Sequence, residues 1–511
     1  MADRIDQSSI SDLVLREIQK YSQHLETDDV GQVVSVGDGI ATVYGLDQAV
    51  YGELIEFSKG TYGMVMNLEA NSVGCALFSD SIGIRENDVC HRTSKVVSVP
   101  VGDALLGRVV DALGRPIDGR GAIESKEYRP VEMPAPSIMS RKPVSEPLQT
   151  GIKAIDAMIP IGKGQRELII GDRQTGKTAL AIDAIINQRG KDVICIYCAI
   201  GQKNSSIAQI VEKLKQHDAL KYTCIVDASA SEPAPMLYLA PYSATSMAEK
   251  WMLKGKDVLI VYDDLSKHAV AYRTLSLLLR RAPGREAYPG DIFYLHSRLL
   301  ERSCRLRDEL GGGSITALPI AETQAGDISA YIPTNLISIT DGQIFLSADM
   351  FNSGQRPAID SGLSVSRVGS AAQTPAVKSV SKDLRMELAS YREMLDFSRF
   401  GSDLDAATKR ILKHGTALME VLKQKQYRPL TSAQETVDIY AAQRGYLDEI
   451  PPERIHHYLK VLSSTISTHY PEVFPSIENT GELTEGVRAD IDKAFKEVVS
   501  TLSKAESERS L

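Results

Sequence analysis

One eight-residue segment constrains the fold of this chain more than any other. Residues 171–178 read G-D-R-Q-T-G-K-T, which is the pattern G-x-x-x-x-G-K-T, and they lie between the apolar run Glu167–Ile170 and the helix-forming run A-L-A-I-D-A. A strand, a glycine-rich loop and a helix in this order form a phosphate-binding loop, or P-loop. The pattern therefore predicts an α/β domain that holds a nucleoside triphosphate at the carboxyl end of one strand.

Each residue type in this loop has a chemical reason to be there. Gly171 and Gly176 let the backbone turn so that successive N–H groups face phosphate oxygens. Lys177 adds a positive charge at the β- and γ-phosphates, and the Thr178 hydroxyl is suited to ligate Mg²⁺. The start of the following helix adds a partial positive charge of its own. The candidate nucleotide-binding residues of the loop are Gly171, Asp172, Arg173, Gln174, Thr175, Gly176, Lys177 and Thr178.

A second apolar run supplies the acidic residue that such a site needs. The run V-L-I-V-Y (258–262) is followed by Asp263 and Asp264. An aspartate that ends a strand beside a P-loop holds Mg²⁺ through water. We predict this role for Asp263, and we interpret Asp264 as a neighbour that is suited to cap the next helix.

The position where hydrolysis needs a base carries an amide instead. In ATPases of this layout a glutamate ends the strand after the P-loop helix. Here the strand V-I-C-I-Y-C-A-I (193–200) is followed by Gly201 and Gln202. Gln202 can hydrogen-bond water or phosphate, but it cannot accept a proton as a carboxylate does. Unless the base lies elsewhere, the site is expected to bind ATP with Mg²⁺ and to hydrolyse it poorly or not at all.

The rest of the chain divides by pattern into four segments. Residues 1–25 have apolar residues at helical spacing, which predicts an amphipathic helix that packs on its own chain or docks on a partner. Short apolar runs with Gly, Asp and Asn turns over 26–95 predict a small β-barrel. Strands alternating with helical stretches over 96–375 predict the P-loop (RecA-like) nucleotide-binding domain. Residues 376–511 lack strand signals and predict a helical bundle, with Thr431 and Gln434 as a capping box. The strands expected in the α/β domain are Glu167–Ile170, Val193–Ile200, Thr223–Val226, Val258–Tyr262, Ile292–Leu295 and Ile315–Leu318.

Composition excludes several other classes of protein. The 66 acidic residues exceed the 58 basic ones, which gives a formal charge of −8 and no overall basic field for nucleic acid. The longest apolar run has eight residues, against about 20 for a membrane-spanning helix. The N-terminus lacks the pattern of a signal or transit peptide. Six cysteines are too few for a disulfide scaffold, and Cys195 and Cys198 fit a buried strand better than a metal or redox site.

An arginine near the end of the α/β domain has two interpretations. Arg367 lies in the loop-like sequence G-L-S-V-S-R-V-G (362–369). It could pair with a carboxylate of its own chain, or it could reach a phosphate in a neighbouring subunit as an arginine finger. The spacing alone does not choose between them.

Several long segments together resemble one family, the alpha subunits of F-type (proton-translocating) ATP synthases. The P-loop segment is one of them, and the resemblance runs from the N-terminal helix to the last helix. The other most specific segments are Q-T-G-I-K-A-I-D-A-M-I-P-I-G-K-G-Q-R-E-L (149–168), Y-D-D-L-S-K (262–267), P-G-R-E-A-Y-P-G-D (283–291), S-V-S-R-V-G-S-A-A-Q (364–373) and F-G-S-D-L-D-A-A-T (400–408).

This resemblance implies a subunit that binds ATP or ADP with Mg²⁺ but does not turn it over. Three copies would alternate with three catalytic beta subunits around a gamma subunit, the central stalk, and the helix over 1–25 would contact the delta subunit of the peripheral stalk. Arg367 would stabilise the transferring phosphoryl group in the neighbouring beta subunit, and Ser364 and Ser366 of the same motif are further catalytic candidates. The resemblance places the adenine near four residues, Arg356, Pro357, Gln424 and Gln426.

The resemblance has two departures and implies a location. Lys425 stands where a small residue is expected, which affects the fit around the adenine, and His268 stands where a glutamine-like residue is expected.

The absence of a transit peptide favours the cytoplasmic face of a bacterial inner membrane, with the chloroplast thylakoid as the alternative.

Three rival functions make different predictions. A catalytic beta-type subunit would carry a more glycine-rich P-loop and a glutamate at position 202. A self-sufficient hexameric motor for RNA or protein would turn over ATP alone, and the acidic charge disfavours RNA as its substrate. A pure assembly scaffold would not need Arg367.

Overall fold

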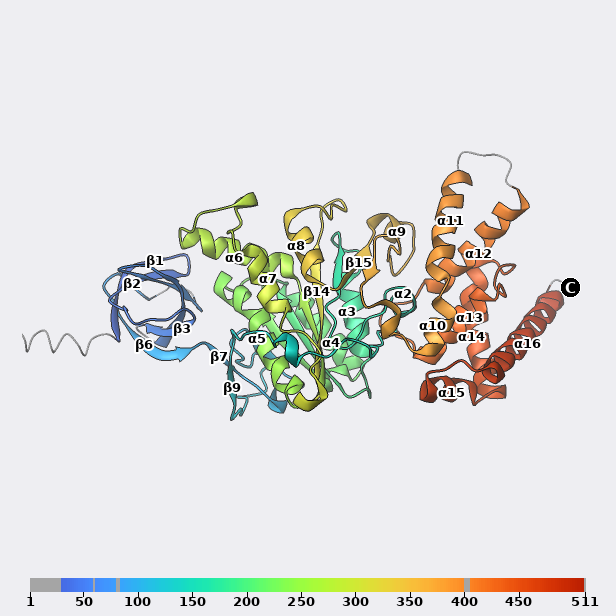
Figure 1. Cartoon of the computed structure of the whole chain (residues 1–511), viewed down its shortest axis with the longest axis horizontal. Coiled ribbons are helices and arrows are strands. Elements are labelled where there is room, and N and C mark those ends of the chain that lie inside the picture. Colours follow the sequence, from blue (N-terminus) through green and yellow to red (C-terminus); the bar gives the residue numbers. More distant parts are fainter. Residues whose placement is uncertain (1–28, 58–59, 80–82, 399–404, 510–511) are drawn as a thin grey trace, which may run out of the picture.

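The molecule is elongated and consists of three parts in chain order (Figure 1). The computed structural model describes residues 29–57, 60–79, 83–398 and 405–509. A β-barrel lies at one end, an α/β domain in the middle and a helical domain at the other end, which confirms the predicted fold class. The amphipathic helix predicted over 1–25 lies outside the described residues.

The barrel closes on itself through six antiparallel strands. Buried residues alternate with partly exposed ones along β3, so one face of the ribbon packs inside the barrel. The strand order is β1-β2-β5-β4-β3-β6, and the last pairing, β1 with β6, removes the free edges. The strands are β1 (Val30–Gly37), β2 (Ile40–Tyr44), β3 (Glu53–Phe57), β4 (Thr61–Leu68), β5 (Val73–Leu77) and β6 (Val89–Val96).

The middle domain is built on an eight-stranded sheet. Its order is β16-β15-β10-β14-β13-β11-β12-β8, and every pair is parallel except β15 with β16. The β10 strand, which leads into the P-loop, is the third from one edge. The strands are β8 (Val109–Asp111), β10 (Leu168–Gly171), β11 (Val193–Ile200), β12 (Thr223–Ala228), β13 (Asp257–Asp263), β14 (Ser314–Glu322), β15 (Gly342–Leu346) and β16 (Val365–Ser366), with β7 (Ser98–Pro100) and β9 (Tyr128–Pro130) in a separate ribbon.

Five of the six predicted strands of this domain are strands in the structure, and one prediction is wrong. The run Ile292–Leu295 is the first turn of a helix, α7. Its buried residues Ile292, Leu295 and Leu299 recur at spacings of three and four, which places them on one side of a helix. A four-residue apolar run is too short to distinguish a buried strand from a helix.

Helices cover both faces of the sheet. Alternate residues of β11 point to opposite sides, so that Tyr197 joins one hydrophobic core and Cys198 the other. The first core contains α2 (Lys153–Met158), α3 (Lys177–Ile186) and α4 (Asn204–Gln216). The second contains α5 (Ala234–Met252), α6 (Leu265–Leu278), α7 (Ile292–Leu300) and α8 (Tyr331–Ile339), and the barrel packs against this side. The short helix α9 (Ala348–Asn352) follows β15.

The helical domain continues the first core without a break. Its buried residues belong to the same cluster as those of α2 and α3. Thr431 and Gln434 form the predicted capping box at the start of α13. The helices are α10 (Pro375–Ser381), α11 (Leu384–Ser398), α12 (Ala406–Leu422), α13 (Ser432–Gln443), α14 (Pro452–His469), α15 (Val473–Thr480) and α16 (Glu485–Arg509).

Within the described segments, we find no helix that combines the length and the hydrophobicity needed to cross a membrane.

Candidate nucleotide-binding site

The P-loop follows β10 and leads directly into α3. A Cβ at Gly171 would lie 2.5 Å from the carbonyl oxygen of Leu346, so β15 can approach the loop this closely only because the residue is glycine. Gln174 (φ 61°) and Gly176 (φ 101°) adopt left-handed conformations. Left-handed residues within a turn direct successive backbone N–H groups to one side, where an anion can bind. The loop therefore has the backbone shape of a phosphate cradle.

The P-loop lysine is buried, and among the described residues its hydrogen-bond partners are carbonyl oxygens and not carboxylates. Lys177 is 7% exposed, and its Nζ donates to the carbonyl oxygens of Gly171 (2.9 Å) and Asp172 (2.5 Å). Burial lowers the pKa of Lys177, and nearby carboxylates, first Glu322, oppose this shift. A buried cation with only neutral partners is costly, and a bound phosphate would compensate its charge.

Thr178, Asp263 and Gln202 come from three different elements and meet at one carboxylate. Thr178 Oγ1 donates to Asp263 Oδ2 at 2.6 Å, and Tyr197 donates to the same oxygen at 2.8 Å. Gln202 Nε2 donates to Asp263 Oδ1 at 2.9 Å. The two residues predicted to hold Mg²⁺ are thus in contact. A hydroxyl and a carboxylate are the hard oxygen donors that Mg²⁺ takes, together with water and phosphate.

The other acidic groups around Lys177 are engaged in structural contacts. Asp264 caps α6, where its Oδ1 accepts a hydrogen bond from the Lys267 N–H at 2.7 Å, as its sequence position suggested. Burial raises the pKa of Asp264 to about 7. Glu322 pairs with Arg173 at 3.0 Å. Among the described residues, the side chain that reaches Asp263 from the end of β11 is thus the Gln202 amide and not a glutamate.

The remaining P-loop side chains brace the loop rather than face its interior. Asp172 Oδ1 accepts hydrogen bonds from Thr323 Oγ1 (2.6 Å) and from the Gly326 N–H (2.9 Å). Thr175 Oγ1 donates to the Asp172 carbonyl at 2.8 Å. Arg173 is exposed and points to Glu322. The loop would hold phosphate mainly through its backbone, Lys177 and Thr178.

A pocket that opens to solvent lies beside the first turns of α3. The structure brings all four predicted adenine-site residues to it, although two follow β15 and two follow α12. Arg356 lies 4.4 Å above the ring of Phe351. The lining residues are Ile152, Thr175, Gly176, Ala179, Leu180, Asp183, Leu346, Phe351, Arg356, Pro357, Gln424, Lys425 and Gln426.

The two glutamines of this pocket differ in their contacts. Gln424 Nε2 donates to the carbonyl oxygens of Gly151 (2.7 Å) and Arg428 (3.0 Å), and its Oε1 accepts from the Lys153 N–H (3.2 Å). Its amide thus ties the 424–428 loop to the segment before α2. Gln426 is exposed at the pocket rim, next to Lys425.

Sequence reasoning missed several lining residues, and one of them is polar. Asp183 lies six residues after Lys177 on α3, and it shares a helix face with Gly176 and Ala179. Helical spacing of three and seven residues counted from Gly176 is the signal that could have identified it. Phe351 and Ile152 carry no comparable signal, because their position depends on the chain's tertiary path.

Arg367 lies at the opposite end of its strand pair from the P-loop. Strand β16 pairs with the start of β15, where Gly342 opposes Ser366. Gly171 opposes Leu346, at the end of β15. The four residue steps from Gly342 to Leu346 correspond to roughly 13 Å of strand. Arg367 is exposed, and its charge partly opposes the raised pKa of the buried Glu167. The strand register shows that the structure does not bring it to the P-loop of its own chain.

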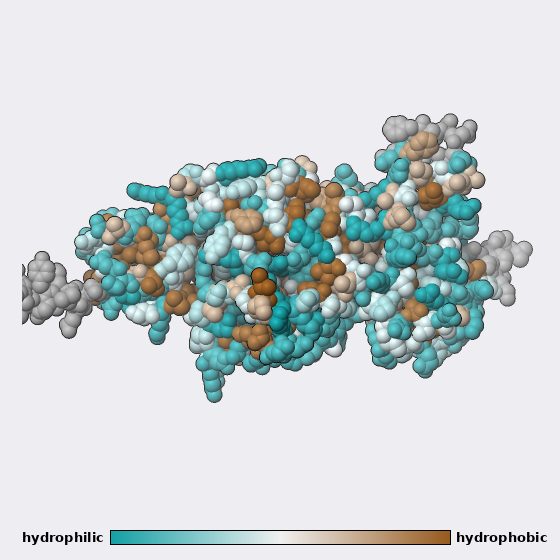
Figure 2. All heavy atoms as spheres, in the orientation of Figure 1, coloured by the Kyte–Doolittle hydropathy of each residue, from teal (hydrophilic) through white to brown (hydrophobic). Residues whose placement is uncertain are grey.

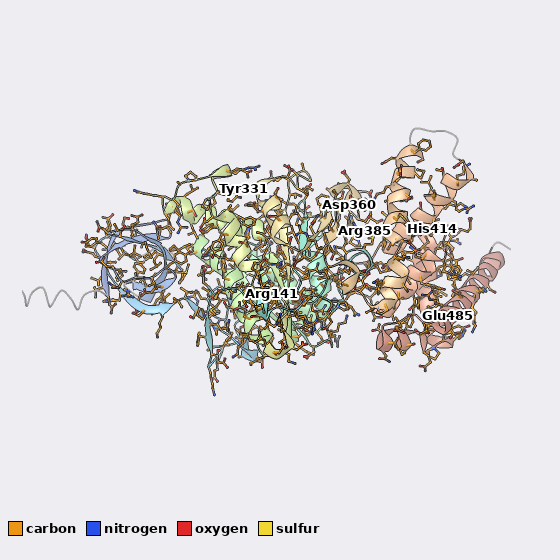
Figure 3. All side chains as sticks on the ribbon, viewed as in Figure 1. Arg141, Tyr331, Asp360, Arg385, His414 and Glu485 are labelled. Atoms are coloured by element: carbon orange, nitrogen blue, oxygen red, sulfur yellow. The ribbon has the colours of Figure 1, made fainter. Side chains whose placement is uncertain are left out.

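The two serines of this motif hold the strand in place. Ser364 Oγ accepts a hydrogen bond from the Phe345 N–H at 2.9 Å, and Ser366 Oγ donates to the Pro160 carbonyl at 2.8 Å. Arg385 of α11, labelled in Figure 3, donates to the carbonyl oxygens of Ser361 and Ser364. These bonds fix the backbone that presents Arg367.

The P-loop, the strand-ending Asp263 and the largely parallel sheet define a P-loop nucleotide-binding protein. Models of one family match three successive parts of the chain: the beta-barrel domain of the ATP synthase alpha/beta family (residues 26–94), its nucleotide-binding domain (151–366) and the C-terminal domain of the ATP synthase alpha/beta chain (373–498). The chain belongs to the ATP synthase alpha/beta family.

Relatives of the same length carry one subunit name. The chain is 58% identical over 493 residues to "ATP synthase subunit alpha" of Clostridium botulinum. The aligned region covers 96% of this chain and 98% of the relative. It is 58% identical over 492 residues to "ATP synthase subunit alpha" of Streptococcus pyogenes, with the same coverage of both chains. The resemblance inferred from the sequence motifs is confirmed.

Proposed function

We propose that this chain is the non-catalytic, nucleotide-binding alpha subunit of an F-type ATP synthase, a complex that makes or hydrolyses ATP with rotary ion translocation. The names of its relatives support the alpha assignment. The observation that carries the non-catalytic role is the hydrogen bond from Gln202 to Asp263. An amide at this point can orient water or phosphate, but it cannot take a proton from attacking water.

The proposed ligand is ATP or ADP with Mg²⁺. The P-loop backbone and Lys177 would hold the phosphates, Thr178 would ligate the metal directly, and Asp263 would hold it through water. The metal would neutralise charge on the phosphates and link them to the protein. The adenine would occupy the pocket formed by Arg356, Pro357 and the 424–426 loop.

We infer that Arg367 acts in a neighbouring catalytic subunit. Its exposure, its lack of a salt bridge with the described residues and its separation from the P-loop of its own chain support a role in trans. A guanidinium placed against the transferring phosphoryl group stabilises the charge that develops there. Ser364 and Ser366 would position the strand without touching the phosphate.

The proposed partners are three beta subunits alternating with three copies of this chain, a gamma subunit as central stalk, and a delta subunit bound by residues 1–25. Ile138 and Met139 of the middle domain are 86% and 70% exposed, which is unusual for large apolar side chains and typical of subunit interfaces. Figure 2 shows further hydrophobic side chains gathered on one face of this domain. The complex would lie at the cytoplasmic face of a bacterial inner membrane, with the thylakoid as the alternative.

A mixing experiment tests this function. We expect phosphate release to rise when the purified chain is combined in equal amounts with a catalytic beta-type subunit, and native mass spectrometry to find three copies of each in the active complex. The isolated chain should release no phosphate. Steady release by the isolated chain would contradict the proposal and favour a self-sufficient hexameric motor.

A further inference from the structure

A buried carboxyl group lies just before β10, and the nucleotide site does not use it. Glu167 is fully buried, and its Oε1 has no hydrogen bond to any described residue. A carboxyl group inside a protein is tolerated when it is paired with a cation, bound to a metal or protonated. The groups that surround Glu167 indicate which of these states it adopts.

The surroundings of Glu167 favour its neutral form. Burial raises the pKa of Glu167 well above its ordinary value, a hydrogen bond from Gln165 lowers it, Asp341 raises it and Arg367 lowers it. Arg166, the residue before Glu167, is not its counter-ion, because its guanidinium pairs with Asp341 at 2.8 Å. These surroundings favour a proton on Glu167 at neutral pH.

One oxygen of Glu167 anchors a buried amide that holds β16. Glu167 Oε2 accepts a hydrogen bond from Gln165 Nε2 at 2.7 Å, and the same nitrogen donates to Ser366 Oγ at 3.2 Å. The Gln165 Oε1 accepts from the Gly162 N–H at 2.8 Å. Because Glu167 Oε2 is an acceptor, it fixes the orientation in which the Gln165 nitrogen faces Ser366.

The carboxyl group of Glu167 also faces the backbone of the β15–β16 pair, where Gly342 opposes Ser366. A Cβ on Gly342 would lie 2.2 Å from the Val365 carbonyl oxygen and 2.6 and 2.9 Å from Oε2 and Oε1 of Glu167. These three acceptors surround one small space, which a glycine at position 342 leaves open. Acceptors that face each other repel, and a proton between two of them replaces the repulsion by a hydrogen bond.

We propose that Glu167 is protonated in the folded chain, donates from Oε1 to the Val365 carbonyl oxygen, and thereby positions Arg367. Val365 lies two residues before Arg367, whose N–H donates to the Asp341 carbonyl oxygen at 2.8 Å. Glu167 is thus a positioning residue that fixes the strand from which the guanidinium extends, without touching the phosphate. This inference rests on the proposed role of Arg367 in the neighbouring catalytic subunit.

The test compares Glu167→Gln with Glu167→Ala, each combined with a catalytic beta-type subunit. Glutamine keeps an acceptor for Gln165 and supplies an N–H donor for the Val365 carbonyl, so kcat should stay within about twofold of the wild type. Alanine removes both contacts. A displacement of about 1 Å can cost about 10²-fold, so kcat should fall about 10- to 100-fold.

The two variants also separate a protonated group from an ionised one. In Glu167→Ala, kcat and kcat/KM should fall together, because the guanidinium acts in the transition state. If Glu167→Gln loses as much turnover as Glu167→Ala, the group acts as a carboxylate and the inference is overturned. Unchanged turnover in Glu167→Ala overturns it as well.

A double variant shows whether Glu167 acts through Arg367. In complexes that carry Arg367→Ala, adding Glu167→Ala should have no further effect on turnover, because the group that it positions is absent. An equal loss in both backgrounds would reveal a general structural effect and overturn the inference.

The matched control is Asp227→Ala. Asp227 is 9% exposed, and its Oδ1 is also unpaired among the described residues. It lies on β12, near the opposite edge of the sheet from β15 and β16. Its variant should keep the wild-type turnover.

Infrared spectroscopy of the isolated chain tests the protonation of Glu167 without a partner subunit. A protonated carboxyl group has a carbonyl stretching band that a carboxylate lacks. We expect this band in the wild-type spectrum minus the Glu167→Gln spectrum at neutral pH. Absence of the band overturns the inference and leaves the proposed function intact. Full turnover by the Arg367→Ala complex instead contradicts the role of Arg367 in trans, so the two failures are distinguishable.

Discussion

Replacing Arg367 by alanine is expected to lower ATP turnover by the mixed complex about 10³- to 10⁵-fold, the range for removal of an arginine finger. The guanidinium of Arg367 is exposed. Its strand, β16, pairs with the first residues of β15, away from the P-loop of its own chain. Its loss would remove charge stabilisation from the neighbouring catalytic site. The measurement is steady-state phosphate release by complexes that contain the wild-type or the variant chain.

Two further variants separate this role from a structural one. Arg367→Lys keeps the charge but loses the planar two-donor geometry, so it should recover only part of the activity. Arg189→Ala removes a surface arginine that pairs with Asp218 and should leave turnover unchanged. Nucleotide binding by the Arg367→Ala chain itself should also be unchanged. Full turnover by the Arg367→Ala complex would favour the scaffold interpretation.

Replacing Lys177 by glutamine is expected to weaken MgATP binding to this chain about 10- to 150-fold. The lysine is buried and its ammonium group donates to carbonyl oxygens of the loop, so a bound phosphate would add the direct anionic partner that it lacks among the described residues. Hydrogen bonds to charged groups contribute about 1.5–3 kcal/mol, which corresponds to this range. The measurement is a titration of the isolated chain with MgATP, followed by calorimetry.

Thermal unfolding gives a second measurement of the loss of MgATP affinity in Lys177→Gln. At 100 times the dissociation constant a ligand stabilises the folded state by about 2.7 kcal/mol, and this gain nearly vanishes when the affinity falls 100-fold. Lys256→Gln is the matched control, because Lys256 pairs with Asp192 on the surface. Unchanged MgATP affinity in Lys177→Gln would show that the nucleotide does not bind at this loop.

The local parts of the nucleotide site were predictable from the sequence, and the parts made by distant segments were not. Residues 171–178 and Asp263 are identified by patterns of a few residues, because a strand followed by a particular loop is a local structure. Phe351 and Ile152 reach the base pocket only through the tertiary path of the chain. The four pocket residues predicted to hold adenine came from a family resemblance and not from spacing.

The fold was predictable to a similar degree. Long apolar runs such as Val193–Ile200 are strands with the expected bounds. The two-residue strand β16 and the three-residue strand β8 are too short to show a hydrophobic periodicity. The prediction of a strand at Ile292–Leu295 is wrong for the same reason, because four apolar residues do not distinguish a strand from a helix. Their structures depend on neighbours in space, which a short sequence window does not contain.

The motif around Arg367 shows the limit of residue-level inference. Ser364 and Ser366 were grouped with Arg367 as catalytic candidates by their place in one motif. In the structure both hydroxyls bond within the chain, to Phe345 and Pro160. Sequence proximity did not distinguish the exposed guanidinium of Arg367 from the two hydroxyls that hold its strand.

The most direct test of the central claim is to identify the nucleotide that this site holds. The isolated chain is loaded with radiolabelled ATP and Mg²⁺, unbound nucleotide is removed, and samples are quenched in acid over time. With Gln202 beside Asp263 in place of a carboxylate base, we predict that the bound label is recovered as intact ATP throughout. Conversion of the bound label to ADP and phosphate within the residence time would contradict a non-catalytic site.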